Sequence, residues 1–176
     1  MKIRMMIPFF VLIAALGCSG GKDGTGGIPA VGGFNPRRYM GVWYEIARFP
    51  HVFEKGMSHV TAEYTLNDDG TISVVNRGRR ENGSASEVRG KAKLASSKGE
   101  GELKVSFFGP FYSPYRIIYL NDSYTVAVVT SSTKDYLWIL CREKLLLPDQ
   151  KETCLKLLRD NGFDVEKLQW VEHHSS

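Results

Sequence analysis

Short runs rich in β-branched and aromatic side chains follow one another along the chain from residue 42. Polar or glycine-containing segments separate them at close spacing, a pattern that predicts strands joined by tight turns. We expect eight strands, at about 42–49, 58–66, 71–79, 86–95, 102–108, 115–121, 124–130 and 136–142.

The hydrophobic pattern becomes helical after the last of these strands, over LPDQKETCLKLLRDNG (147–162). Pro148 suits the first turn of a helix, and Gly162 falls where a helix is commonly ended by a residue with positive φ. The following run, FDVEKLQWV (163–171), predicts a short ninth strand.

Eight sequential strands and one late helix predict an all-β fold, an eight-stranded up-and-down antiparallel barrel with the helix packed outside. An open sandwich is the alternative. Successive links of such a barrel alternate between its two ends. The links at 67–70, 96–101 and 121–123 are polar and tight, whereas those at 50–57 and 109–114 are longer and aromatic. One end is therefore expected to be closed and the other to form a mouth.

The stretch GVWYEIARFP (41–50) has no cleanly polar face. Alternation places Trp43, Glu45 and Ala47 on one side, which we assign to the barrel interior, and leaves the other side for the helix to cover. Trp43 begins the first strand and Arg142 ends the eighth, so both fall at the closed end. If the barrel closes, the guanidinium can stack on the indole as a structural plug.

Alternation also nominates the interior lining. The proposed ligand-binding positions are Glu45, Ala47, Val60, Ala62, Tyr64, Val74, Asn76, Val88, Gly90, Ala92, Val105, Phe107, Tyr119 and Trp138. Small residues mixed with aromatics favour a hollow that suits an acyl chain, and a filled barrel is the alternative. The inward polar groups either contact a ligand or satisfy one another.

Five residues are assigned to the mouth: Phe53, Arg77, Arg79, Phe111 and Tyr112. The arginines either attract a phosphate or carboxylate head group or are simply solvated charge. The aromatic side chains are candidates to gate entry or to contact a bilayer.

Residues 1–17 have the basic start, short apolar run and small-residue ending of a secretory signal. The residues before Cys18 suit ordinary signal peptidase and also resemble a bacterial lipobox, in which Cys18 would be the lipid attachment site. Residues 18–33 predict a flexible tether with a reach of roughly 20 Å. Residues 34–176 then form the folded domain.

Three cysteines leave one without a partner in an oxidising compartment, which favours lipid on Cys18. Cys141 has outward parity, and Cys154 lies on the apolar stripe of the helix. The two predict a disulfide between helix and barrel, with two buried free thiols as the alternative.

Removing residues 1–17 lowers the formal net charge from +4 to +2, which argues against nucleic acid as a partner. The four histidines show no metal-ligand spacing, and no phosphate-binding loop or nucleophile elbow appears. We expect no metal, no cofactor and no enzymatic activity. His173 and His174 are expected in a solvated tail.

The stretch around Gly41, Trp43, Tyr44 and Glu45 resembles the Gly-x-Trp-Tyr-Glu motif of lipocalins, and SSTKDYLWILCR (131–142) resembles their two later motifs. HVFEKG, VTAEYTL, LKVSFFGPFY and GFDV are similar to bacterial outer-membrane lipocalins related to apolipoprotein D.

The resemblance implies a protein that stores or transports fatty acids or lysophospholipids, anchored in the outer membrane through its N-terminal lipid and facing the periplasm. Ser19 after the cysteine implies the same sorting. A lipocalin-type enzyme and a structural lipoprotein with a filled barrel are the alternatives. The sequence leaves open whether the chain forms a homodimer.

Overall fold

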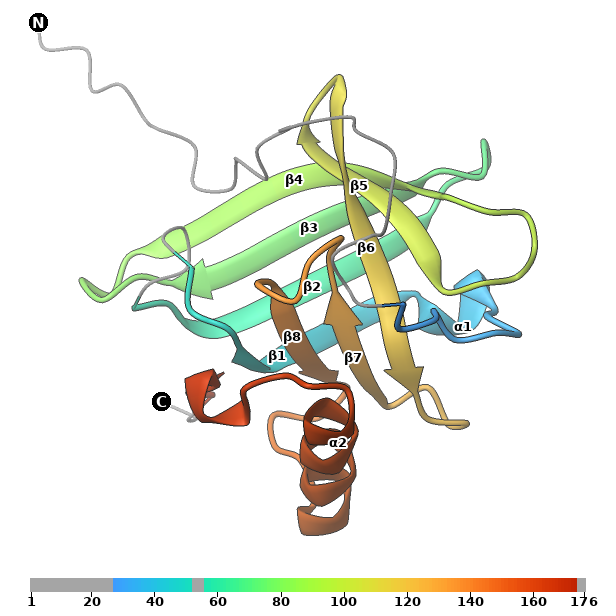
Figure 1. Cartoon of the computed structure of the whole chain (residues 1–176). Coiled ribbons are helices and arrows are strands. Elements are labelled where there is room, and N and C mark those ends of the chain that lie inside the picture. Colours follow the sequence, from blue (N-terminus) through green and yellow to red (C-terminus); the bar gives the residue numbers. More distant parts are fainter. Residues whose placement is uncertain (1–26, 52–55, 174–176) are drawn as a thin grey trace, which may run out of the picture.

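A closed antiparallel barrel of eight strands makes up most of the computed structural model, which describes residues 27–51 and 56–173 (Figure 1). Each strand pairs with the next, and β1 pairs with both β8 and β2, which closes the barrel. The strands are β1 (Gly41–Arg48), β2 (Ser58–Leu66), β3 (Ile72–Arg79), β4 (Ala85–Leu94), β5 (Glu102–Phe108), β6 (Phe111–Leu120), β7 (Val126–Thr130) and β8 (Leu137–Cys141). The predicted barrel is confirmed, and the open sandwich is excluded.

The helix α2 (Pro148–Asp160) packs outside the barrel, as predicted (Figure 1). Its buried residues Cys154 and Leu158 join a hydrophobic cluster with outward side chains of β1, β7 and β8. The backbone N–H of Leu147 donates to Gln150 Oε1 at 3.0 Å where the helix begins. Gly162 adopts a φ of +72° just after the helix ends, a conformation that glycine takes without steric cost.

A one-turn helix, α1 (Pro36–Tyr39), lies at the closed end and was not predicted, because four residues carry no periodic signal. Asn35 Oδ1 caps it by accepting from the N–H of Arg37 at 3.0 Å. The segment just before α1 is attached to the barrel, since Val31 N–H donates to Ile117 O at 2.9 Å and Ile28 is buried. The described end of the predicted tether, residues 28–33, therefore contacts the folded domain.

The hairpin of β5 and β6 extends past the neighbouring strands at the mouth. β6 begins at Phe111 rather than at the predicted residue 115, and its pairing with β7 starts only at Arg116. Residues 111–115 therefore have a partner strand on one side only, where Pro114 is tolerated because a proline cannot donate to a ladder.

The C-terminal segment bridges β1 and β2 where these strands diverge. Their direct pairing covers only Gly41 to Tyr44 of β1. Beyond it, the short strand β9 (Gln169–Trp170) pairs with β1 after the single turn η1 (Val165–Lys167). Val171 N–H donates to Ile46 O at 2.9 Å, and His59 N–H donates to Glu172 O at 2.8 Å. The predicted ninth strand thus exists and closes the seam.

Among the described helices, none is long and apolar enough to cross a membrane.

Candidate functional site: the barrel interior

The inward side chains fall into two groups by solvent exposure. Those near the closed end are fully buried in one cluster: Trp43, Tyr64, Ile72, Val74, Ala92 and Leu103. Those nearer the mouth are half-buried: Ala62, Asn76, Val88, Gly90, Val105, Phe107 and Trp138. Inward side chains of a closed barrel remain accessible only where the interior is not filled. The accessible space therefore lies in the mouth half, above a packed floor.

The floor is sealed by Arg142 and Trp43. The Arg142 guanidinium carbon lies 3.9 Å from the centroid of the Trp43 ring, as the topology predicted. Its Nη1 and Nη2 donate to the carbonyl oxygens of Val42 and Met40, each at 2.7 Å, so the cation also ties α1 to β1. Trp43 Nε1–H donates to Tyr39 O at 2.8 Å. The guanidinium thus covers one face of the indole, and the indole N–H has a hydrogen-bond acceptor at the barrel base.

Three tyrosine hydroxyls meet on the floor above this plug. Tyr115 Oη lies 2.7 Å from Tyr39 Oη and 3.0 Å from Tyr64 Oη. Burial raises the pKa of Tyr64 to about 12 and holds the pKa values of the other two well above their ordinary value. The hydroxyls therefore stay protonated, and they satisfy one another inside an otherwise apolar cluster.

A buried ion pair lies on the inner wall of β1. Arg48 Nη1 donates to Glu45 Oε1 at 2.6 Å, and both residues are at most 5% exposed. The Arg48 side chain also donates through Nη2 to Met57 O at 3.2 Å. Strict alternation had placed Arg48 outside, so sequence reasoning missed it. The available signal was Glu45 itself, because an inward carboxylate in an apolar barrel requires a cationic partner.

A β-bulge in β1 produces this arrangement. Glu45 lies opposite Leu140 and Ala47 opposite Ile139, so Ile46 is the extra residue. Beyond the bulge the facing reverses: Ala47 packs in the outer cluster with Ile139, while Arg48 lies opposite the inward Trp138. The prediction that Ala47 lines the cavity is wrong, because one inserted residue changes the face of every later side chain.

The C-terminal segment satisfies the carbonyl groups of the bulge from outside. Val171 N–H bonds to Ile46 O, and His173 Nε2 lies 2.7 Å from Glu45 O. The His173 ring also packs edge-on against Tyr44, with centroids 5.4 Å apart. Burial, opposed by the bond to Glu45 O, lowers the pKa of His173. The expected solvated tail is therefore wrong for His173, whereas His174 lies outside the described residues.

Of the three inward polar residues predicted, Asn76 is the one whose side-chain oxygen has no protein partner within the described residues. It lies opposite Ala62 on β2 and Val88 on β4, and its buried Oδ1 accepts no hydrogen bond from a described residue. Glu45 and Tyr64, the other two inward polar predictions, have protein partners instead. Asn76 can therefore hydrogen-bond a polar group of a molecule inside the barrel without first losing a protein partner at Oδ1.

The space beside Gly90 is filled by the ring of Phe107 and does not form part of a hollow. A Cβ there would meet the Phe107 ring at 2.7 Å and Ser106 O at 2.6 Å. Phe107 thus lies across β4 and forms part of the wall. Val60, also predicted to line the cavity, is buried, and its side chain lies with that of Met57 next to Gly78.

The prediction that Tyr119 lines the cavity is wrong for the same reason as for Ala47. In β6, Ile117 lies opposite Val129 and Tyr119 opposite Val128, so Ile118 is an extra residue. Tyr119 consequently packs against the outer cluster, and Ile117 faces the floor.

Aromatic side chains stand at the mouth. The His51 ring lies 5.8 Å from Trp138 and 5.9 Å from Tyr136, measured between centroids. Phe111 and Tyr112 are exposed at the start of β6. The predicted mouth residue Phe53 lies outside the described residues. His51 was not among the predicted mouth residues, although it lies in the aromatic link that was assigned to this end.

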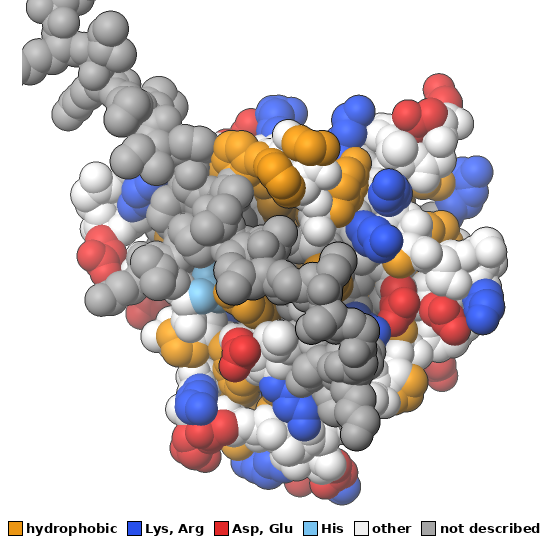
Figure 2. Space-filling model, turned by 45° about the horizontal axis from the view of Figure 1, so that its top comes forward, with side chains coloured by type: hydrophobic (Ala, Val, Ile, Leu, Met, Phe, Trp, Pro, Cys, Tyr) orange, Lys and Arg blue, Asp and Glu red, His pale blue; other side chains and the backbone are white. Residues whose placement is uncertain are grey.

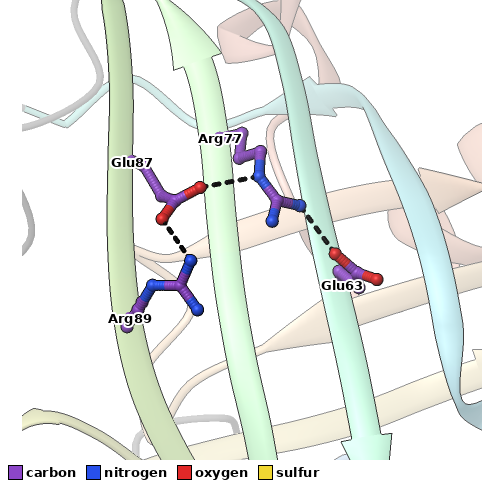
Figure 3. Close-up of polar contacts among 4 residues, drawn as sticks. All are labelled: Glu63, Arg77, Glu87 and Arg89. Carbon is purple, nitrogen blue, oxygen red and sulfur yellow. Dashed lines mark hydrogen bonds and ion pairs between the residues drawn. The ribbon is translucent and has the colours of Figure 1, made fainter.

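Arg77 is not a mouth residue. It lies on the outer wall, where its Nη1 is 2.6 Å from Glu63 Oε2 and its Nε is 2.8 Å from Glu87 Oε2 (Figure 3). The two carboxylates raise the pKa of Arg77 and neutralise its charge. Arg79 is exposed at the end of β3, opposite Ala85. The head-group role predicted for Arg77 is therefore wrong, because its parity on β3 is outward.

The predicted disulfide is absent: Cys141 and Cys154 are both buried free thiols in the outer cluster. Cys141 Sγ is engaged by the turn after β8, where it lies 3.8 Å from Leu145 O and accepts from Glu143 N–H at 3.4 Å. Burial raises the pKa of the Cys154 thiol to about 12. The two sulfur atoms act here as small apolar groups.

No group of three His, Cys, Asp or Glu side chains that could hold a metal ion occurs within residues 27–51 and 56–173. The interior chemistry is thus that of an apolar chamber with one neutralised ion pair, a tyrosine floor and one available amide. Such a chamber binds and orients a lipophilic molecule.

Comparisons with known sequences agree with this geometry. A family model described as "Lipocalin-like domain" matches residues 34–173. The chain is 43% identical over 151 residues to "Outer membrane lipoprotein Blc" of Escherichia coli (strain K12), covering 85% of each chain. It is 39% identical to the protein of the same name from Vibrio cholerae, covering 96% of this chain and 99% of that one. Mouse apolipoprotein D is 34% identical, with 80% of this chain and 77% of that protein covered.

Solved structures show the same fold at lower identity. Insecticyanin from the tobacco hornworm Manduca sexta superimposes with a TM-score of 0.70 at 23% identity, covering 84% of this chain and 85% of that one. Apocrustacyanin A1 from lobster gives a TM-score of 0.66 at 21% identity, covering 80% and 81%. With the family model spanning nearly the whole barrel, the chain belongs to the lipocalin family.

Proposed function

We propose that this protein binds lipophilic ligands in the bacterial cell envelope, with the ligand in the mouth half of the barrel. The main support is the solvent exposure of the inward residues: those in the mouth half are partly exposed, whereas those near the closed end are buried. Relatives named outer membrane lipoproteins, at 39% to 43% identity over most of the chain, support the envelope location. The family and the interior chemistry favour a binding protein over an enzyme.

The preferred ligand is a single-chain amphiphile, a fatty acid or a lysophospholipid. Val88, Val105 and Phe107 offer an apolar wall, and each methylene buried there contributes about 0.8 kcal/mol. Arg48 is already paired with Glu45, so the wall presents no uncompensated cation to a carboxylate. Asn76 Oδ1 is an acceptor, so it can accept from a protonated carboxyl group of a fatty acid or from the glycerol hydroxyl of a lysophospholipid.

Titration of the mature chain carrying Cys18→Ser with a fluorescent fatty acid tests this proposal. We expect saturable binding and displacement by lysophosphatidylethanolamine. Native mass spectrometry of the same sample would reveal a copurified lipid and would show whether the protein is a monomer or the homodimer that the sequence leaves open. Absence of saturable binding would contradict the proposal and favour a structural lipoprotein.

Anchoring is proposed to occur at Cys18, which lies outside the described residues. The relatives' name and the lipobox resemblance support an N-terminal lipid anchor in the outer membrane. The anchored barrel would then face the periplasm. Metabolic labelling with palmitate should mark the wild type, and Cys18→Ser should abolish the label. A Cys18→Ser protein that is still processed and still membrane-bound would contradict this anchor.

A further inference from the structure

The tip of the β5–β6 hairpin is an exposed aromatic projection beside the mouth (Figure 1). Its pairing with β4 begins only at Ser106, and its pairing with β7 begins only at Arg116. At the tip, Phe111 is 69% exposed and Tyr112 is 41% exposed. A projecting segment with such side chains is free to contact another surface.

A row of lysines runs along the outer wall next to this tip. Lys93 on β4 lies directly opposite Lys104 on β5, and Lys91 is the preceding outward residue of β4. All three are exposed, and none forms an ion pair within the described part of the chain. Like charges directly opposite one another on a sheet are destabilising. The arrangement therefore leaves positive charge that an external anion could compensate.

The aromatic tip and the lysine row form one surface. Lys93 Nζ lies 4.6 Å from the centroid of the Tyr112 ring, and Figure 2 shows hydrophobic side chains gathered on the upper face with Lys and Arg side chains beside them. We call the surface made by Lys91, Lys93, Lys104, Phe111 and Tyr112 the hairpin face.

The neighbouring wall of β2–β4 is different. There Glu63, Arg77, Glu87 and Arg89 alternate in sign and form ion pairs of 2.6 to 2.8 Å (Figure 3). The two carboxylates and two guanidinium groups of that network balance each other's charge, so the network does not require an external counter-ion. On the outer faces of β4 and β5, the cations without an ion pair are therefore the lysines of this row beside the aromatic tip.

We propose that the hairpin face docks on an anionic phospholipid surface. Exposed aromatic side chains enter the boundary between head groups and acyl chains, and lysines beside them attract lipid phosphates. Ile28, which is bound to the barrel, lies ten positions after Cys18, and this length of chain spans at most about 36 Å, so an anchored barrel stays within reach of the bilayer. Docking would place the hairpin tip, which lies beside the mouth, against the membrane that supplies the ligand of the proposed function.

Vesicle flotation with the mature Cys18→Ser chain tests the docking. We expect binding to mixed phosphatidylcholine–phosphatidylglycerol vesicles that weakens with salt, and little binding to phosphatidylcholine alone. The double variant Lys93→Glu/Lys104→Glu should bind at least about tenfold more weakly, since each lysine near an anionic surface adds substantially to the affinity. Phe111→Ser should weaken binding independently of salt.

Matched controls give the test its specificity. Lys98→Glu/Lys144→Glu makes the same change in net charge at exposed lysines away from the hairpin, and Leu145→Ser removes a side chain that is 78% exposed. Both controls should bind vesicles like the parent protein. Equal losses in the hairpin and control variants, or no binding by the parent, would overturn the proposal.

Fatty-acid titration of the same samples separates this inference from the proposed function. The Lys93→Glu/Lys104→Glu protein should bind the fluorescent fatty acid normally. If no variant binds the fatty acid while the parent still floats with anionic vesicles, the proposed ligand is contradicted and the docking surface stands.

Discussion

Arg48 and Glu45 form an ion pair on the inner wall of β1, three residues apart on one strand, because Ile46 is bulged out between them. The bulge carbonyls of Glu45 and Ile46 are bonded in turn by His173 and Val171 of the C-terminal segment. The ion pair inside the barrel is therefore positioned by a bulge whose carbonyl groups are bonded from outside the barrel.

This pair yields a stability prediction. Arg48→Met should destabilise the protein by about 3 kcal/mol, because it leaves a buried carboxylate without its cation. Glu45→Leu/Arg48→Met should be less destabilised than Arg48→Met alone, because no buried charge remains. Urea unfolding of the three proteins measures the difference. A double variant at least as unstable as the single one would contradict the assignment of a buried pair.

The plug at the closed end predicts coupled losses. Trp43→Ala removes a fully buried ring, and Arg142→Ala removes its stacked cap and the bonds to α1, so each should cost a few kcal/mol. Their double variant should be less destabilised than the sum, since the pair shares one interaction. Strictly additive free energies of unfolding would argue against the stack.

His173 predicts a pH dependence of stability. Its pKa is lowered from 6.5 chiefly by burial, with nearby His59 and Lys144 acting in the same direction. The unfolded chain therefore binds a proton more tightly, so this group reduces the free energy of unfolding as pH falls below about 6.5 and has no effect well above it.

Urea unfolding between about pH 8 and pH 5 should show a larger loss for the wild type than for His173→Gln, whose amide can still donate to Glu45 O. His59→Gln serves as a control for the neighbouring imidazole. Identical pH profiles for wild type and His173→Gln would show that His173 does not couple to folding.

The cysteines predict a reactivity pattern. Because both thiols are buried and their pKa values are raised, Cys141 and Cys154 should resist alkylation in the native protein at about pH 8. Both should be labelled after denaturation without reductant. A pair that becomes reactive only after reduction would instead demonstrate a disulfide in the envelope.

Alternation and turn chemistry predicted the barrel, its closed end and the external helix, because these depend on local patterns. Ala47, Arg48 and Tyr119 were assigned to the wrong face, because a bulge inserts one residue and reverses the facing of every later side chain in the strand. No residue type in Glu45–Ala47 or Ile117–Tyr119 marks such an insertion. The position of the extra residue is set by the pairing register with the neighbouring strand.

Tertiary contacts explain the other differences. His173 looked like part of a polar tail, yet the diverging β1 and β2 leave a seam that the C-terminal segment fills. Arg77 lies within an arginine-rich stretch, but its carboxylate partners come from β2 and β4. Such partners are brought together by the sheet and carry no mark in the local sequence.

The central claim is that a ligand occupies the mouth half of the barrel. Ala62→Trp fills that space from the inner face of β2, whereas Thr65→Trp places the same side chain on the exposed outer face of the same strand. Titration of both mature Cys18→Ser variants with the fluorescent fatty acid measures the effect directly. We predict that Ala62→Trp abolishes binding without unfolding the barrel and that Thr65→Trp binds normally. Normal binding by a folded Ala62→Trp protein would contradict the claim and place the ligand elsewhere.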